Sequence, residues 1–167
     1  MNNSFGIFFA HLFELNNKSM EITLRPYELS DRTALEEIFM MNTPKYFDPK
    51  ELGDFLEYLD IFGDDYVVAV VDRRIVGGGG YWVRSFDQQG GLSWAFVHPD
   101  FQGTGVGKEL ALYRIDQIRQ SGVAKTILVE TSQHSFGFYE KLGFKLLNRQ
   151  IDYWAKGIDL YSAVLEL

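Results

Sequence analysis

The feature that most constrains the fold is a glycine-rich loop placed between an apolar strand and an amphipathic helix. Residues 92–97 (LSWAFV) form an apolar run that is typical of a buried strand. Glycines then occupy positions 103, 105 and 107, and helical periodicity runs over residues 106–120. A further apolar strand is predicted over residues 126–130. A helical connection between two such strands predicts that they lie parallel in one sheet, with the helix packed against it.

The rest of the chain alternates between strand and helix patterns, with no internal repeat or linker. Two amphipathic helices are expected after the first strand, one capped by Ser30 or Asp31 and one with Pro49 as its first residue. The predicted order is strand, helix, helix, three strands, helix, strand, helix and two strands, which is an α/β arrangement. The predicted strands cover residues 22–25, 66–71, 75–83, 92–97, 126–130, 144–151 and 159–167, and the last helix covers 135–142.

Four consecutive glycines, Gly77 to Gly80, fall inside the third predicted strand. Glycine weakens a strand interior, so its presence there indicates a bulge or the close approach of another backbone. A loose loop explains the same residues. The sequence leaves both interpretations open.

Composition narrows the class of protein and of partner. The 167 residues, 46% of them hydrophobic and 23% charged, are enough for one soluble domain with a sizeable core. The absence of cysteine excludes disulfides and Cys nucleophiles, and the three histidines have no metal-ligand spacing, so no metal is expected. A net charge of −7 argues against nucleic acid as a partner, because phosphate binding needs a basic face.

Residues 1–19 are predicted to form an N-terminal extension, and residues 20–167 the folded domain. The apolar stretch from Phe5 to Phe13 is far shorter than the roughly 20 residues that span a bilayer. It also lacks the basic region and the cleavage site of a secretory signal. The extension is interpreted either as a segment docked on the domain or as residues upstream of the true start at Met20. No membrane partner is expected, and the expected location is cytoplasmic.

The glycine loop has the properties of a phosphate-binding turn. Unpaired N–H groups at a helix N-terminus carry the positive end of the helix dipole, and alternate glycines let an anion approach the backbone. The dinucleotide fingerprint G-x-G-x-x-G does not fit, because Gly107 comes one residue early. The P-loop pattern does not fit either, because Gln102 replaces its first glycine and Glu109 its Ser or Thr. Both nucleotide-binding interpretations therefore fail on specific residues.

Three segments together resemble the Gcn5-related (GNAT) N-acetyltransferases, and the resemblance covers nearly all of residues 20–167. Residues 102–107 (QGTGVG) resemble the family's Q/R-x-x-G-x-G/A pyrophosphate loop, and residues 97–99 (VHP) precede it. Residues 138–144 (FYEKLGF) resemble the family's F-Y-x-K-x-G-F signature. The resemblance implies a mixed, partly splayed sheet of about seven strands with about four flanking helices.

The resemblance also implies that acetyl-CoA is the co-substrate. Main-chain amides of residues 102–107 would hold its diphosphate, and a main-chain N–H at Phe96 or Val97 would polarise the thioester carbonyl. Ser132 stands where the family has an Asn, and Ile127 stands where N-terminal protein acetyltransferases of this superfamily have Glu or His. The expected coenzyme-binding residues are Phe96, Val97, Gln102, Gly103, Thr104, Gly105, Val106, Gly107, Lys108 and Ser132.

Acetyl transfer to an amine needs a base for the amine and an acid for the departing thiolate. The family uses the tyrosine of its signature as the acid, which is Tyr139 here, and a phenol pKa of about 10 lies near that of a thiol. Glu130, at the end of a predicted strand, is the expected base, acting directly or through water. An ordinary solvent-facing strand-end residue is the alternative interpretation of Glu130. His98 and His134 are alternative bases.

The acceptor side is expected to be aromatic and acidic. The segment from Tyr153 to Tyr161 resembles the hairpin that covers the acceptor site in many GNAT members, although packing under a hairpin explains the same rings. Residues 1–65 hold 13 of the 23 acids and 5 of the 16 bases, which would attract a cationic amine. A solvated helix face explains these charges as well. The expected acceptor-binding residues are Glu28, Trp82, Trp94, Tyr153 and Trp154.

The predicted function is transfer of the acetyl group of acetyl-CoA to a primary amine by direct attack in a ternary complex. The expected acceptor is a small amine, cationic if the acidic residues steer it, or a peptide amine. N-terminal or lysine protein acetylation is one alternative, and a non-catalytic acyl-CoA sensor is another. Residues 91–95 (GLSWA) come near a hydrolase G-x-S-x-G elbow, but Ala95 replaces the last glycine. The resemblance also suggests a homodimer formed through the C-terminal strands.

Overall fold

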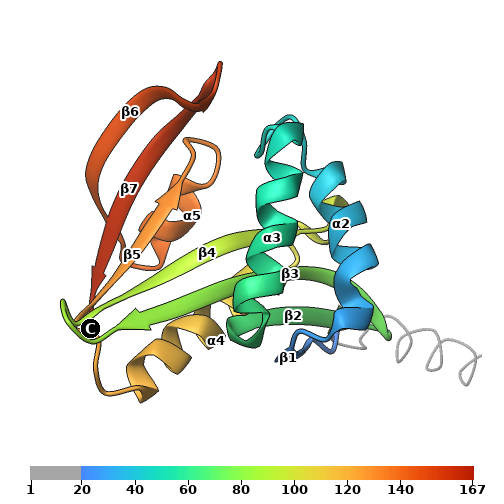
Figure 1. The fold of residues 1–167 in the computed structure, drawn as a ribbon, viewed down its shortest axis with the longest axis horizontal. Helices are drawn as coiled ribbons and strands as arrows, with labels where there is room; N and C mark the ends of the chain where they lie inside the picture. The colour runs from blue at the N-terminus through green and yellow to red at the C-terminus, as the bar shows by residue number, and fades with distance from the viewer. Residues whose placement is uncertain (1–19) are drawn as a thin grey trace, which may run out of the picture.

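The fold is built on a mixed sheet of seven strands, and four α-helices flank it within residues 20–167 (Figure 1). The structure is a computed structural model that describes residues 20–167, so the apolar segment from Phe5 to Phe13 lies outside the described residues. The predicted order of strands and helices is confirmed. The strands are β1 (Thr23–Pro26), β2 (Tyr66–Val71), β3 (Arg74–Arg84), β4 (Gln89–Val97), β5 (Thr126–Thr131), β6 (Lys145–Ala155) and β7 (Ile158–Glu166), and the helices are α2 (Arg32–Met41), α3 (Leu52–Phe62), α4 (Val106–Gln120) and α5 (Phe136–Lys141).

The strand order across the sheet is β1-β2-β3-β4-β5-β7-β6. Neighbouring strands are antiparallel except β4 and β5, which are parallel as the helical connection α4 predicts. These two strands pair only where residues Gln89–Leu92 meet Thr126–Val129. Beyond that point they diverge, and Figure 1 shows them as the two arms of a fork. The predicted splaying of the sheet is therefore confirmed, and it begins after Leu92 on β4 and Val129 on β5.

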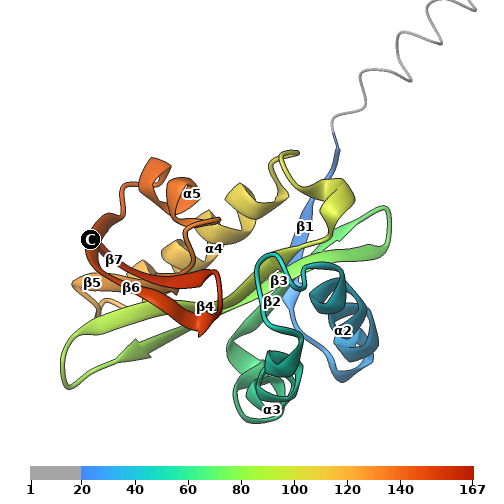
Figure 2. The ribbon, with the colours of Figure 1, turned by 90° about the horizontal axis from the view of Figure 1, so that it is seen from above.

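The helices cover both faces of the sheet. Figure 2 shows α2 and α3 on one face and α4 and α5 on the other. The α2–α3 side is an aromatic core, in which Phe39 stacks on Phe55 with ring centroids 5.5 Å apart and Phe96 packs edge-on against both. The other side is mainly aliphatic and includes Ile118 and Ile127, both fully buried. Within residues 20–167, no helix is long and apolar enough to cross a membrane.

The starts of α2 and α3 differ slightly from the sequence expectation. Each α-helix follows a short 3₁₀ turn, and the capping residue precedes that turn. Before α2, Glu28 caps the turn in a capping box with Asp31, and Asp31 itself is the residue directly before α2 but makes no side-chain capping bond to that helix. The Asp31 carboxylate instead accepts hydrogen bonds from the Glu28 N–H (2.9 Å) and from both terminal nitrogens of Arg25 (2.7 and 2.8 Å). Pro49 is the first residue of the second turn, as predicted.

The glycine run lies within strand β3, so the loose-loop interpretation is wrong. Neighbouring side chains occupy the space that a Cβ atom would need. A Cβ on Gly78 would lie 2.5 Å from Cε1 of Tyr66, and a Cβ on Gly79 would lie 2.7 Å from Cζ of Arg114. These two glycines let large side chains from opposite faces pack directly onto the strand.

Strand β4 carries one extra residue opposite the glycine run. Trp94 and Ala95 together lie opposite Gly79, which makes a β-bulge, and Trp94 has a left-handed backbone with φ of 45°. A bulge bends its strand and re-aims the side chains on it. The bulge lies just past the point where β4 leaves β5, and its extra residue is on β4, opposite the glycine strand.

Candidate functional site

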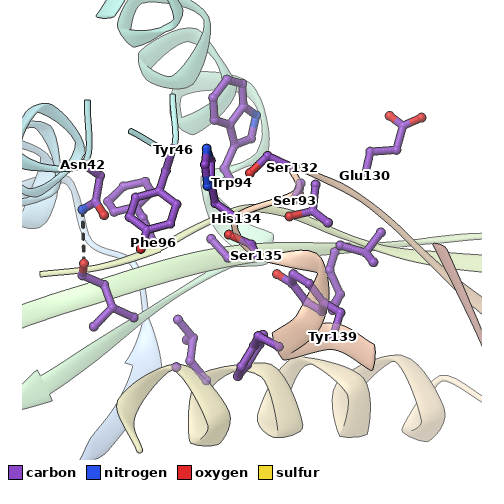
Figure 3. Close-up of a pocket in the computed structure, with 18 of the residues that line it drawn as sticks. Asn42, Tyr46, Ser93, Trp94, Phe96, Glu130, Ser132, His134, Ser135 and Tyr139 are labelled. Atoms are coloured by element: carbon purple, nitrogen blue, oxygen red, sulfur yellow. Dashed lines mark hydrogen bonds between the residues drawn. The ribbon is translucent and has the colours of Figure 1, made fainter. Parts of the chain in front are cut away.

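A cavity of about 830 Å³ occupies the gap that opens between β4 and β5 (Figure 3). Its walls come from the ends of these two strands, the segment between α2 and α3, the start of α4, and helix α5. The cavity brings together residues that are far apart in the chain, from Asn42 to Trp154. The diverging strands supply main-chain edges that have no partner strand, which is a suitable surface for an extended ligand.

The glycine loop forms one end of this cavity. Gly103 and Gly105 have φ of 76° and 101°, which are left-handed conformations that favour glycine. In the first backbone hydrogen bond of helix α4, the Glu109 N–H donates to the Gly105 carbonyl (3.0 Å). The amides of residues 106–108 come before it and have no acceptor within the helix. They form a concentrated set of free donors at the positive end of a 15-residue helix.

The individual loop residues play different parts. Gly103, Gly105, Gly107 and Lys108 line the cavity. Thr104 and Val106 do not line it: the Thr104 hydroxyl donates to the Phe101 carbonyl (2.6 Å), and the Val106 side chain is fully buried. Such side chains hold the loop in shape, and the glycine main chain borders the cavity.

A network of side-chain amides, one of them buried, fixes the loop to the end of β4. The Gln102 Nε2 donates to Oδ1 of Asn42 (3.0 Å) and to the Val97 carbonyl (3.1 Å). The Asn42 Nδ2 donates to the same carbonyl (3.1 Å) and to the Ile38 carbonyl (2.8 Å). Asn42 is only 3% exposed, and the sequence analysis missed it. A polar residue directly after an amphipathic helix gave no sign of this contact with β4.

Tyr139 lies on α5 and faces the cavity. Its side chain is buried, and its ring packs edge-on between Phe138 (5.1 Å) and Phe144 (5.5 Å). Figure 3 shows the Tyr139 hydroxyl directed toward the middle of the cavity. The buried residue Ser132 supports the helix, because its carbonyl accepts the N–H groups of Ser135 (3.0 Å) and Phe136 (2.9 Å). Ser132 also lines the cavity.

The three candidate bases lie in different settings. Glu130 is exposed at the edge of the cavity, and Figure 3 shows its side chain apart from the rest. His134 lines the cavity and packs edge-on against Tyr46, with ring centroids 6.1 Å apart. His98 does not line it, because its Nδ1 accepts the Asp100 N–H (3.2 Å) and caps a 3₁₀ turn.

The aromatic wall is formed by part of the expected set. Trp82, Trp94 and Trp154 line the cavity, as do Phe96 and Val97 on β4. Trp94 and Phe96 come from the bulged strand β4, whereas Trp82 comes from β3 and Trp154 from β6.

Two expected acceptor residues lie elsewhere. Glu28 caps the turn before α2, and Tyr153 is 52% exposed, with its ring against that of Trp154 (4.9 Å). The structure adds Tyr46, Phe47 and Glu51, which lie before or at the start of α3. Burial raises the pKa of the Glu51 carboxyl above its ordinary value, and its Oε1 accepts the Asp48 N–H (2.7 Å).

Known proteins resemble the chain in sequence and in structure. Glucosamine 6-phosphate N-acetyltransferase of Trypanosoma brucei brucei is 35% identical over 83 residues, which are 47% of this chain and 56% of that relative. Ribosomal-protein-S18-alanine N-acetyltransferase from Escherichia coli superposes with a TM-score of 0.73 at 21% identity, covering 87% of this chain and 94% of the other. The protein yncA from Salmonella typhimurium was solved with its cofactor acetyl-CoA. It superposes with a TM-score of 0.68 at 22% identity, and the match covers 88% of this chain and 94% of the other.

Family membership rests on a family model that matches more than half of the chain. The family model described as "Acetyltransferase (GNAT) family" matches residues 32–144. This range includes α2, α3, the bulged strand β4, the glycine loop and Tyr139. The structural matches show the same fold over most of the chain, whereas the curated relative is matched over about half of its length. The chain belongs to the GNAT acetyltransferase family.

Proposed function

We propose that the protein is an acetyl-CoA-dependent N-acetyltransferase that transfers the acetyl group to a primary amine by direct attack in a ternary complex. The observation that carries this proposal is the continuous cavity between β4 and β5. It has free helix amides at one end, and the hydroxyl of Tyr139 reaches its middle. A coenzyme with an anionic head and a reactive thioester tail needs both features in one channel.

Acetyl-CoA fits the donors that the chain offers. The diphosphate would meet the amides of residues 103–108, where the glycines leave the backbone accessible. The pantetheine arm would follow the opened edges of β4 and β5 toward Phe96 and Val97, with Ser132 as a further hydrogen-bond partner. A main-chain N–H at the bulged end of β4 would polarise the thioester carbonyl. The Salmonella neighbour, which has the same fold and was solved with acetyl-CoA, supports the choice of coenzyme.

The chemistry follows from the groups around the thioester. The amine nitrogen attacks the carbonyl carbon, a C–N bond forms, and the C–S bond breaks. The base, Glu130 directly or through water, removes a proton from the attacking amine, and His134 is the alternative inside the cavity. Tyr139 gives its proton to the departing thiolate. A phenol suits this role because its pKa lies near that of a thiol.

The proposed acceptor is a small cationic amine. Glu51 and Glu130 contribute carboxylates to the cavity lining, and the rings of Trp94, Tyr46 and Phe47 lie there as well. Carboxylates attract an ammonium group, and aromatic faces bind cations by a cation–π interaction. These groups give such an amine both charge and shape complementarity.

An amino-sugar phosphate is a second candidate acceptor. The Trypanosoma relative is named for glucosamine 6-phosphate, and it is 35% identical over the matched segment. Lys108 and Lys141 line the cavity and could receive a phosphate group. The E. coli structure is named for a ribosomal-protein alanine, which makes a protein amine a third acceptor to examine.

A thiol-release screen tests the proposal. The purified protein is incubated with acetyl-CoA and a panel of polyamines, aminoglycosides, amino acids, glucosamine 6-phosphate and short peptides, and free CoA is measured. We expect release to depend on the amine and to be fastest with a polyamine. Calorimetry with acetyl-CoA alone separates the outcomes: binding without release for any amine indicates a sensor, and no binding contradicts the coenzyme site.

The assembly proposed for the protein is a homodimer through its C-terminal strands. Strand β6 is an edge strand of the sheet, and edge strands offer unpaired backbone groups. Leu146, Leu147, Ile151 and Tyr153 on β6 are between 47% and 75% exposed. Light scattering on the purified protein tests this assembly, and a mass near 19.2 kDa, that of one chain, would contradict it.

A further inference from the structure

A buried arginine beneath the cavity has no role in the chemistry described so far. Arg114 lies in the middle of α4, is 1% exposed, and still contributes to the cavity lining. Its Nε donates to the Leu110 carbonyl (3.0 Å) and its Nη1 to the Gly80 carbonyl (3.1 Å). No carboxylate among residues 20–167 lies within 4.0 Å of its guanidinium. Arg114 is therefore a buried cation paired only with neutral carbonyls.

Such a charge is costly, and the fold makes specific room for it. Taking an unpaired ion out of water costs several kcal/mol, which is a large fraction of the total stability of a typical domain. Gly79 supplies the space, because a Cβ there would lie 2.7 Å from Cζ and from Nη1 of Arg114. The guanidinium thus lies against the strand position that faces the β4 bulge.

The guanidinium also keeps donors available to a ligand. It has five N–H donors, of which the two carbonyls use only part. The only fully enclosed side-chain polar atom without a partner among the described residues is the Tyr27 hydroxyl. The Nη2 of Arg114 has no bond to the described residues and is not fully enclosed, and Arg114 lines the cavity, so Nη2 is a donor available to a ligand there.

The position of Arg114 decides which ligand can reach it. Arg114 comes from α4, on the sheet face where the glycine loop also lies, whereas α2 and α3 cover the other face (Figure 2). In the proposed complex the coenzyme enters along α4. A chemical group that contacts Arg114 therefore belongs to the coenzyme rather than to the acceptor. The thioester lies at the bulge of β4 in this complex, so the part of the coenzyme nearest to Arg114 is the acyl chain.

We propose that Arg114 binds a carboxylate at the far end of the acyl chain, so that the enzyme also uses acyl-CoA donors such as succinyl-CoA and malonyl-CoA. The inference rests on the proposed coenzyme site. Transfer proceeds as for acetyl: the amine nitrogen bonds to the thioester carbonyl carbon, the C–S bond breaks, and CoA leaves as the thiol. The terminal carboxylate does not react, and it neutralises Arg114 through charge-assisted hydrogen bonds.

Binding measurements test the inference without any turnover. Calorimetry compares succinyl-CoA with butyryl-CoA, which has the same four-carbon length but no charge. We expect succinyl-CoA to bind the unmodified protein at least about tenfold more tightly, because a hydrogen bond to a charged group contributes about 1.5–3 kcal/mol. Arg114→Met should abolish that preference, and Arg119→Met, at an exposed arginine of the same helix, should keep it.

Two further measurements keep the test decisive. Thermal unfolding shows whether Arg114→Met is folded, and Gly79→Ala provides a second variant, which displaces the guanidinium but keeps its charge and should also reduce the preference. Equal binding of succinyl-CoA and butyryl-CoA by the unmodified protein, or a preference that survives Arg114→Met, would overturn the inference. If acetyl-CoA itself fails to bind, the proposed function fails, and that result is separate from the preference between donors.

Discussion

The hydroxyl of Tyr139 can be removed without disturbing the packing of its ring. The ring is held between Phe138 and Phe144, and a phenylalanine keeps these contacts. In Tyr139→Phe we expect kcat to fall about 100-fold or more, the range for loss of a general acid, while the Kd for acetyl-CoA stays unchanged. Thiol release measures the first quantity and calorimetry the second. Tyr113→Phe, on α4 outside the cavity lining, is the matched control, and an unchanged kcat in Tyr139→Phe removes the phenol from the mechanism.

The carboxyl of Asp31 is expected to make stability depend on pH. Burial alone would raise its pKa, but hydrogen bonds from Arg25 and from the Glu28 N–H outweigh burial and hold the pKa below its ordinary value. A carboxyl with a lowered native pKa contributes its full stability above the unfolded pKa, near 4, and loses it as the pH falls through the native value. We expect Asp31→Asn to lower the free energy of unfolding by about 1–3 kcal/mol at pH 7.

Urea unfolding of the Asp31→Asn variant and the unmodified protein at pH 7, 5 and 3 measures this effect. The difference in free energy of unfolding between the two proteins should be the same at pH 7 and 5 and should narrow at pH 3, because below its ordinary pKa the Asp31 carboxyl binds a proton more readily in the unfolded than in the native state. A difference in free energy of unfolding that stays constant down to pH 3 would show that the ion pair is not the source of the stability.

Sequence signals identified the site residues very unevenly. Tyr139 and the glycine loop were predictable because a short motif carries them. Asn42 and Glu51 were not, since their roles depend on contacts with β4 and on burial that no local pattern reports. Arg114 falls on the apolar stripe of α4 by its spacing from Leu110, so a charge in a buried position was visible in the sequence. Only the structure shows how the fold accommodates this charge, with Gly79 beside the guanidinium.

At the scale of the element, a glycine before one helix and a glycine inside another should respond in opposite ways to the same substitution. Gly105, the residue before α4, has φ of 101°, so alanine there is strained and should cost about 1–2 kcal/mol. Gly53 lies in α3 with open space around it, so alanine should stabilise the protein by about 0.5–1 kcal/mol. Urea unfolding gives both values. Gly105→Ala should also weaken acetyl-CoA binding in calorimetry, and Gly53→Ala should leave it unchanged; equal effects of the two would contradict the proposed anion-binding loop.

The elements with strong local signals were predicted closely, and the others were not. The predicted range 106–120 is that of α4, because glycines bound the helix and its apolar stripe is regular. Strand β6 was expected to stop at Ile151, but it continues to Ala155. The register between β6 and β7 breaks in this stretch, where Asp152 has φ of 52°. A strand that continues through such an irregularity has no steady alternation for the sequence to show.

At the scale of the whole molecule, the parting of β4 and β5 creates the site, and residue patterns alone could not locate it. Each strand looks like an ordinary buried strand, and the place where pairing stops depends on the bulge at Trp94 and on what packs against the glycine run. The family resemblance supplied the expectation of a splayed sheet. The structure gives its cause in this chain: β3 lacks side chains where Tyr66 and Arg114 need space, and β4 bends opposite it.

The uneven distribution of charge over the molecule predicts how salt affects turnover. Residues 1–65 hold 13 of the 23 acids and 5 of the 16 bases, and the segment between α2 and α3 in this part of the chain lines the cavity, with Glu51 among its residues. Carboxylates of α2 and α3 at the rim would speed the encounter with a cation, and added salt screens this attraction over a Debye length of about 10 Å at 0.1 M. With a polyamine acceptor we expect kcat/KM to fall about tenfold between about 50 and 300 mM salt. Glucosamine 6-phosphate, whose phosphate is repelled by the same rim, should show a much smaller fall or a rise. Equal salt dependence for the two acceptors would mean that these acids are a solvated surface with no part in choosing the amine.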